Sequence, residues 1–132
     1  MQYKTDLKEK FTVVTFLDAS LTSNSVPEIN ELTQKILSQS PKNLVVNCGQ
    51  VKQWDPSIIA VLANAQEQFY DNNASFVICA LSDTLQNSID HSEYAEMMNL
   101  TPTETEAWDI VQMEEIEREL LDSDDMEFSA EN

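Results

Sequence analysis

The chain has 132 residues, a length typical of one domain with a single core. Hydrophobic residues make up 42% of it, too many for a fully disordered chain, and 24 acidic against 7 basic residues give a formal net charge of −17. This charge excludes the class of nucleic-acid binders, which must neutralise phosphates with Lys and Arg, and an anionic membrane surface would repel the chain for the same reason.

The predicted elements alternate between strand and helix. β-Branched and aromatic residues predict a strand over 11–17, and apolar runs predict strands over 43–47 and 75–81, with a short one near residue 100. Helical spacing of apolar residues predicts helices over about 27–40, 56–71, 83–98 and 103–120. Asn72-Asn73 marks the end of the second helix, and the capping box Thr103-x-x-Glu106 opens the last. The alternation predicts an α/β domain with a mainly parallel sheet of four to five strands and about four helices.

The C-terminal segment is the most acidic part of the chain. Residues 101–132 hold 12 acidic residues and one basic residue, Arg118. We expect the domain to span residues 1–121 and residues 122–132 to form a disordered acidic tail. The last helix carries an apolar stripe consisting of Ile110, Met113, Ile116 and Leu120. This stripe either docks on the domain's own sheet or belongs to an acidic surface for a basic partner.

The turn before the second predicted helix is the most informative stretch. Asp55 is a strong N-cap, because its carboxylate can accept from free N–H groups of the first turn, and Pro56 suits the first helical position. Trp54 and Ile59 occupy the positions of a hydrophobic staple. Ser57 therefore falls in the first turn, where N–H groups and the helix dipole stabilise a phosphate. Local chemistry alone also fits an ordinary first-turn serine.

The order of elements and three short motifs resemble the STAS domain family, which includes sulphate-transporter cytoplasmic domains and bacterial anti-sigma-factor antagonists. The motifs are the polar link that begins Leu17-Asp18-Ala19, the strand NLVVNC and the sequence D-P-S-I-I. The resemblance covers roughly residues 3–121. It implies a STAS-like fold, to which the residues themselves add the acidic character of the C-terminal helix and tail.

Phosphorylatable members of that family carry an Asp before the turn and a Ser or Thr two positions later, which takes the phosphate. Asp55 and Ser57 match this pair, and Ile59 matches an aliphatic position that follows. Ile58 stands where the family usually has Gly, and Pro56 where it has a small polar residue. We expect the β-branched side chain beside the acceptor to crowd a docking kinase.

The resemblance implies a non-catalytic regulatory module that binds a kinase-type anti-sigma factor by partner switching. Phosphate on Ser57 would break the complex, and a serine phosphatase would restore it. The expected partner-binding residues are Asp18, Ser20, Thr22, Asn24, Trp54, Asp55, Ser57, Ile58 and Ile59. The alternative is a constitutive accessory subunit of a larger assembly such as a membrane transporter complex, which the departure at Ile58 favours.

The residues do not predict an enzyme, a cofactor or a metal site. One glycine, Gly49, is too few for a dinucleotide fingerprint or a P-loop. The lone histidine, His91, lies in a polar segment and offers no base to a nucleophile. Asp122-x-Asp124 begins like a calcium loop but lacks its Gly and its closing Glu.

Other features favour a cytoplasmic protein without direct membrane insertion. The longest apolar run, 58–63, is far shorter than a spanning helix, and MQYKTDLKEK lacks the apolar region of a secretory signal. Cys48 and Cys79 lie within apolar runs, where a free cysteine packs as a small hydrophobic residue.

Overall fold

A five-stranded sheet in the order β1-β2-β4-β6-β7 forms the centre of the structure, a computed structural model that describes residues 1–131, with side chains through residue 121. Its strands are β1 (Tyr3–Leu7), β2 (Phe11–Phe16), β4 (Asn43–Asn47), β6 (Phe76–Cys79) and β7 (Leu100–Thr101). A separate two-stranded sheet consists of β3 (Ser20–Leu21) and β5 (Gln53–Trp54). The α-helices are α1 (Val26–Leu37), α2 (Pro56–Asp71), α3 (Asp83–Asp90) and α4 (Glu104–Glu131), and the 3-10 helices are η1 (Ser23–Ser25) and η2 (Ala95–Met97).

The pairing of the large sheet confirms the α/β class and the mainly parallel sheet. β2, β4, β6 and β7 run parallel to one another, whereas β1 pairs antiparallel with β2 and places Tyr3 opposite Phe16. β1 is absent from the predicted elements. Its side chains are all exposed, but Tyr3, Thr5 and Leu7 alternate with charged residues, which is the period-2 signal of a strand.

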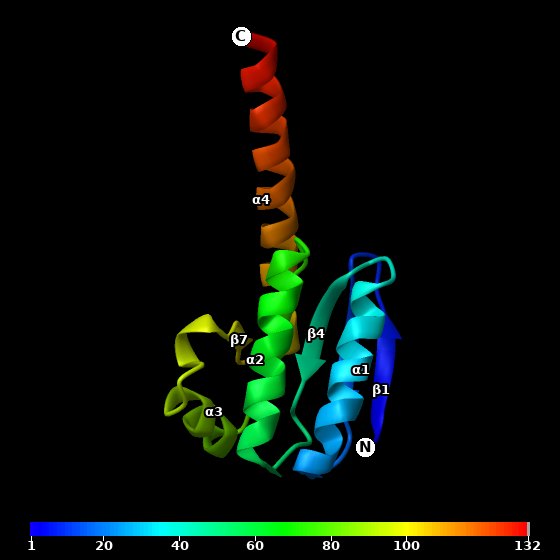
Figure 1. Cartoon of the computed structure of the whole chain (residues 1–132), viewed down its shortest axis with the longest axis vertical. Helices are drawn as coiled ribbons and strands as arrows, with labels where there is room; N and C mark the ends of the chain where they lie inside the picture. The colour runs from blue at the N-terminus through cyan, green and yellow to red at the C-terminus, as the bar shows by residue number, and fades with distance from the viewer. Residues whose placement is uncertain (132) are drawn as a thin grey trace.

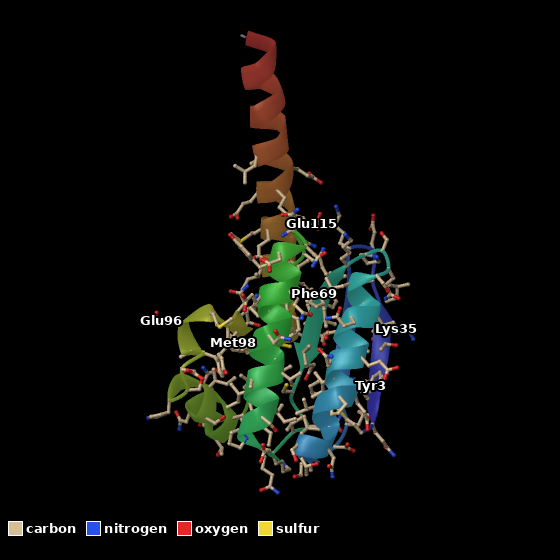
Figure 2. All side chains as sticks on the ribbon, in the orientation of Figure 1. Tyr3, Lys35, Phe69, Glu96, Met98 and Glu115 are labelled. Atoms are coloured by element: carbon tan, nitrogen blue, oxygen red, sulfur yellow. The ribbon has the colours of Figure 1, made fainter. Side chains whose placement is uncertain are left out.

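Helices cover both faces of the sheet, α1, α2 and α3 on one face and α4 on the other (Figure 1). Successive side chains of a strand point to opposite faces. In β4, Leu44 therefore belongs to the core under α1 and α2, and Val45 belongs to the core under α4. Phe69 of α2 lies inside the domain, whereas Tyr3 and Lys35 lie at its outer edge (Figure 2). Burial on both faces explains the continuous apolar runs of these strands.

Two helix boundaries agree with their local sequence signals. α2 ends at Asp71 with Asn72 as its C-cap, and Asn73 follows with a φ of 57°, which confirms the end that the Asn pair predicts. At the start of α4, the backbone N–H of Glu106 donates to Oγ1 of Thr103 at 3.2 Å, as in a capping box. Side-chain chemistry at these positions therefore predicts the C-terminal end of α2 and the start of α4.

α3 is shorter than predicted, because the expected helix over 83–98 ends at Asp90. The hydroxyl of Ser92 donates to the carbonyl of Ile89 at 2.6 Å and accepts from the N–H of Tyr94 at 3.2 Å. These bonds occupy backbone groups that a continued helix would use, so the chain turns and forms only the short η2.

α4 packs on the sheet through its first turns. Ala107 and Val111 are fully buried, whereas Met113, Ile116 and Leu120 are exposed. The interpretation that the apolar stripe docks on the domain's own sheet is therefore wrong for these three residues. At about 100° per residue, positions 107 and 111 share one side of the helix, and positions 113, 116 and 120 lie on the opposite side.

The backbone of α4 is helical through Glu131, including residues 122–131, which the sequence analysis assigns to a disordered tail. Neither Gly nor Pro occurs in that segment to interrupt the helix. The side chains of 122–131 and the whole of residue 132 lie outside the described residues, so the domain division at residue 121 stays a prediction. In the part of the chain that the structure describes, each helix is too short or too polar to cross a membrane.

Candidate functional site

The two segments that the sequence analysis selects, the link after β2 and the turn before α2, lie side by side. β3 and β5 pair in parallel, with Ser20 opposite Gln53 and Leu21 opposite Trp54. The backbone N–H of Asp55 also donates to the carbonyl of Leu21 at 2.9 Å. Ser20 and Gln53, 33 positions apart in the sequence, therefore belong to one continuous surface. We call it the β3–β5 surface; it consists of the link, residues 18–24, and the turn, residues 53–57.

The link contributes polar side chains to the β3–β5 surface. Ser20, Thr22 and Asn24 are exposed, and Asp18 is half-buried. Oγ1 of Thr22 accepts from the N–H of Asn24 at 3.3 Å, which caps η1. Oδ2 of Asp18 accepts from the N–H of Gln2 at 3.1 Å and so connects the link to the N-terminal segment. These bonds hold the link in place and leave its hydroxyl and amide groups available to a partner.

A cavity of about 270 Å³ opens between the two segments, and its lining includes three residues outside the expected set, the buried Leu21 and the exposed Ser23 and Gln53. Nε2 of Gln53 donates to Oγ of Ser20 at 3.3 Å. A two-residue strand is too short to show a period, so the sequence holds no pattern that marks Gln53. Ser23 could have been predicted from the sequence, because it lies between Thr22 and Asn24, two expected partner-binding residues of the link.

Asp55 and Ser57 form the start of α2 in the way that their spacing predicts. Oδ2 of Asp55 accepts from the backbone N–H of Ser57 at 2.9 Å and from its hydroxyl at 2.5 Å, and Pro56 follows as the first helical residue. The hydrogen bond from the Ser57 hydroxyl, and to a smaller extent the one from its N–H, hold the pKa of the Asp55 carboxyl below its usual range. Asp55 is exposed and Ser57 is half-buried, so both reach the β3–β5 surface.

Trp54 is half-buried and links this surface to α3. Its ring packs against the core cluster that contains Ile59, and its Nε1 donates to Oγ of Ser88 at 3.0 Å. Because the indole is held from two sides, it supports the shape of the turn. Its exposed edge remains part of the lining of the cavity.

Ile58 and Ile59 point into the core and not to the surface. Their exposed fractions are 0% and 5%, because they lie on the side of α2 that packs on the sheet. Two of the nine expected partner-binding side chains are therefore inaccessible to a partner in this fold. From the sequence we expect the side chain of Ile58 to crowd a kinase that docks at Ser57. This side chain is instead buried in the core, so it does not reach the surface at which a kinase would dock.

The cysteines and the histidine do not form a chemical centre. The N–H of Cys48 donates to the carbonyl of Cys79 at 3.0 Å, but the two thiols belong to core clusters on opposite faces of the sheet. Burial raises the pKa of both thiols, that of Cys79 to about 12, with a smaller contribution from Glu104. Nδ1 of His91 lies 2.8 Å from the carbonyl of Asn87 on an exposed helix end.

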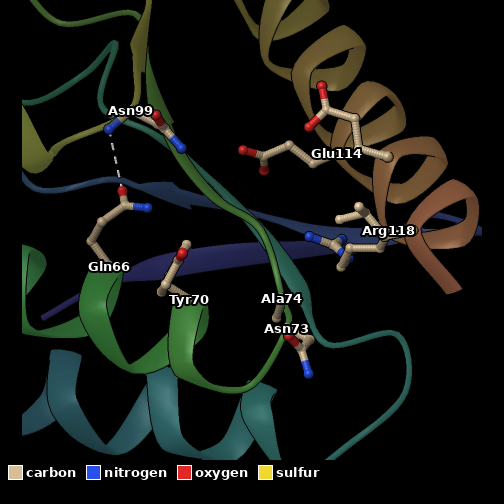
Figure 3. A pocket seen from close by; sticks show the side chains of 9 residues that line it. Gln66, Tyr70, Asn73, Ala74, Asn99, Glu114 and Arg118 are labelled. Atoms are coloured by element: carbon tan, nitrogen blue, oxygen red, sulfur yellow. Dashed lines mark hydrogen bonds between the residues drawn. The ribbon is translucent and has the colours of Figure 1, made fainter. Parts of the chain in front are cut away.

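A cavity of about 390 Å³ lies far from this surface, between the end of α2 and α4 (Figure 3). In it, Oε1 of Gln66 accepts from the N–H of Asn99 at 3.2 Å, and Arg118 bonds to Glu115 at 2.9 Å. Its described lining holds no Ser, Cys, Lys or His side chain, so it offers no nucleophile with a base. Within residues 1–121, no three His, Cys, Asp or Glu side chains gather as metal ligands; Asp122 and Asp124 have side chains outside the described residues.

Comparison with known proteins identifies a domain family and similar folds. The STAS domain family matches residues 4–107 of this chain. No curated protein sequence matches it significantly. Since the family match covers the link, the turn and the parallel strands, it includes the entire β3–β5 surface.

Several solved structures share the fold, three of which are compared with this chain below. An anti-sigma-factor antagonist (STAS) domain protein from Planctomyces limnophilus has a TM-score of 0.69 at 16% identity, over 80% of this chain and 93% of its own. The anti-sigma factor antagonist SpoIIAA in its unphosphorylated form also has a TM-score of 0.69 at 16% identity, over 84% of this chain and 96% of SpoIIAA. The murine anion transporter Slc26a9 has a TM-score of 0.64 at 14% identity, over 82% of this chain and 18% of the transporter.

Proposed function

Because the chain belongs to the STAS domain family, we propose that it is a non-catalytic, cytoplasmic regulatory module whose β3–β5 surface binds a partner protein. The partner in this proposal is a kinase-type anti-sigma factor, as the likeness to anti-sigma-factor antagonists suggests. Ser57 carries a phosphate that ends the complex, and a serine phosphatase removes it. The observation that carries the proposal is the pairing of β3 with β5, which joins the link and the Ser57 turn in one accessible surface.

The local geometry supports a switch at Ser57. A phosphoserine carries a charge of about −1.5 to −2 at neutral pH, and this charge would replace a hydroxyl that now donates to the carboxylate of Asp55. The phosphate would repel that carboxylate and compete with it for the free N–H groups at the start of α2. Both effects change the charge and shape of the β3–β5 surface, so a partner fitted to the unmodified surface would be released.

Capture of partners from native lysate tests this proposal. The wild-type chain, Ser57→Ala and Ser57→Asp are immobilised, and the bound proteins are identified by mass spectrometry. Thr84→Asp is the matched control, because Thr84 occupies the same second position of α3 that Ser57 occupies in α2. We expect a kinase-type partner on the wild type, on Ser57→Ala and on Thr84→Asp, and at least tenfold less of it on Ser57→Asp.

A second function, a constitutive accessory subunit of a larger assembly, is favoured by a separate observation. A similar fold occurs within the chain of the anion transporter Slc26a9, and Ile58 replaces the family's usual Gly. This function predicts one partner that all four chains hold equally, with Ser57 as an ordinary first-turn serine. That result would overturn the switch and leave the binding surface in place.

A further inference from the structure

The outer side of α4 carries an apolar stripe that the domain does not cover. Met113, Ile116 and Leu120 are exposed to 59%, 55% and 56% of their surface. Large apolar side chains at this exposure, grouped on one side of a helix, are typical of an interaction site. We call these three residues the outer stripe.

The outer stripe lies on the side of α4 opposite its buried residues, and Ile116 borders a cavity that Lys10 also lines. The opposite side of α4 is occupied by the buried Ala107 and Val111 and, further along, by Arg118, which bonds to Ser75 at 3.2 Å. Figure 1 shows α4 continuing past the end of α2, so that its C-terminal part stands free of the sheet. A partner could therefore lie along this helix without displacing any element of the fold.

Over one heptad, the spacing of the outer stripe matches that of a coiled-coil seam. Positions 113, 116 and 120 correspond to a, d and a of a heptad, the positions that meet a partner helix. The flanking e and g positions are then Glu117 and Glu119, both exposed. In a coiled coil these positions lie opposite the e and g residues of the partner and decide which helix pairs.

The flanking charges oppose a second copy of this chain as the occupant. In an antiparallel pair, Glu117 and Glu119 would each face the same residue of the other copy. The whole chain adds repulsion, because two copies each carry a net charge of −17. Lys or Arg at the facing positions would instead form ion pairs.

We propose that the outer stripe of α4 binds an amphipathic helix of another protein, whose apolar seam is flanked by Lys and Arg. The apolar seam supplies the contact area, and the opposite charges raise the association rate and select the partner. This site is independent of the β3–β5 surface, since the start of α2 and the free end of α4 lie at opposite ends of the molecule (Figure 1). One partner at each end can bind at the same time.

Synthetic helices test the proposal directly. The probe is a fluorescein-labelled peptide of about three heptads with Leu at a and d and Lys at e and g, and a second peptide carries Glu in place of Lys. Binding is measured by fluorescence anisotropy at physiological salt with the wild-type chain and with Met113→Ser/Ile116→Ser/Leu120→Ser. The control is Leu7→Ser/Tyr70→Ser/Met97→Ser, which removes exposed apolar side chains from other elements.

We expect the Lys peptide to bind the wild type and the control at least tenfold more tightly than it binds the outer-stripe variant, and the Glu peptide to bind none of them. Glu117→Lys/Glu119→Lys should reverse this preference and bind the Glu peptide. Equal binding of the Lys peptide by the outer-stripe variant would overturn the proposal, because charge alone would then explain it. A wild-type dimer in sedimentation that dissociates in the outer-stripe variant would also overturn it, since a second copy would then be the occupant.

Discussion

Asp55 is the residue on which the start of α2 depends. One carboxylate oxygen accepts both the hydroxyl and the N–H of Ser57, so a single side chain caps the helix and orients the proposed phosphate acceptor. Both donors favour the ionised carboxyl, which is why its pKa lies below the usual range. The cap is therefore coupled to pH and to any modification of Ser57.

Asp55→Ala should lower Tm by a few degrees at pH 7, because the first-turn N–H groups lose their acceptor. A depressed pKa contributes stability that is present above the unfolded pKa, about 3.9 for Asp, and is lost as pH falls through the lower folded pKa. The Tm difference between wild type and Asp55→Ala should therefore shrink below about pH 4. Thermal unfolding followed by circular dichroism from neutral to acidic pH measures it.

Asp83→Ala is the control for this prediction, because Asp83 lies in the first turn of α3 but the N-cap there is Ser82. It removes the same charge and keeps the cap, so Tm should change little. An equal loss in both variants would mean that helix-dipole charge, and not the cap, accounts for the effect.

The candidate site divides into residues that short-range chemistry predicts and residues that it does not. Asp55 and Ser57 were predictable, because capping depends on neighbours two positions apart. The burial of Ile58 and Ile59 was not, since it depends on which side of α2 meets the sheet. Gln53 became part of the site only through its pairing with Ser20, a contact between distant segments.

Among the elements, the parallel strands and α2 were predicted best, because burial on both faces of the sheet leaves long apolar runs. The elements missed are β1, β3 and β5, which are short or exposed and are held by backbone hydrogen bonds to neighbours. The stripe on α4 was found, but its orientation was not. α4 has apolar residues on two sides. Helical periodicity predicts both sides from the sequence, but it does not indicate which side packs on the sheet.

Arg118 fixes the position of α4 on the sheet. Its guanidinium bonds to Glu115 at 2.9 Å, to Ser75 at 3.2 Å and to Asn43 at 3.4 Å, so it joins α4 to the starts of β4 and β6. Burial acts to raise the pKa of Glu115, but hydrogen bonds from Asn43 and Arg118 outweigh it and leave the pKa below its usual range.

Arg118→Ala should lower the free energy of unfolding by about 1–3 kcal/mol, the range for leaving part-buried polar groups without their charged partner. Urea denaturation at pH 7 measures this loss. Part of it should disappear below about pH 4.3, the unfolded pKa of Glu, because the ionised form of Glu115 carries the pairing. Lys42→Ala, which removes an exposed cation before β4, should change stability far less, and an equal loss there would contradict a specific role of Arg118.

Over the whole molecule, repulsion between like charges opposes the fold. The chain has 24 acidic and 7 basic residues, and within residues 1–121 only two ion pairs come within 4.0 Å, Met1 with Glu28 and Arg118 with Glu115. Most carboxylates of these residues therefore have no cationic partner within 4.0 Å, and acidic groups far outnumber basic ones. Dissolved salt screens such exposed charges, over a Debye length of about 10 Å at 0.1 M.

Raising NaCl from about 10 mM to about 300 mM should therefore raise Tm by several degrees, because screening weakens the repulsion more than it weakens the few attractive pairs. Differential scanning calorimetry measures the shift. NaBr at equal ionic strength should give nearly the same rise, since screening depends on ionic strength and not on the identity of the anion. A Tm that stays constant or falls with added salt would contradict this prediction, because attractive interactions between surface charges would then outweigh the repulsive ones. In that case the acidic residues of α4, to which we assign partner selection, would not destabilise the free chain.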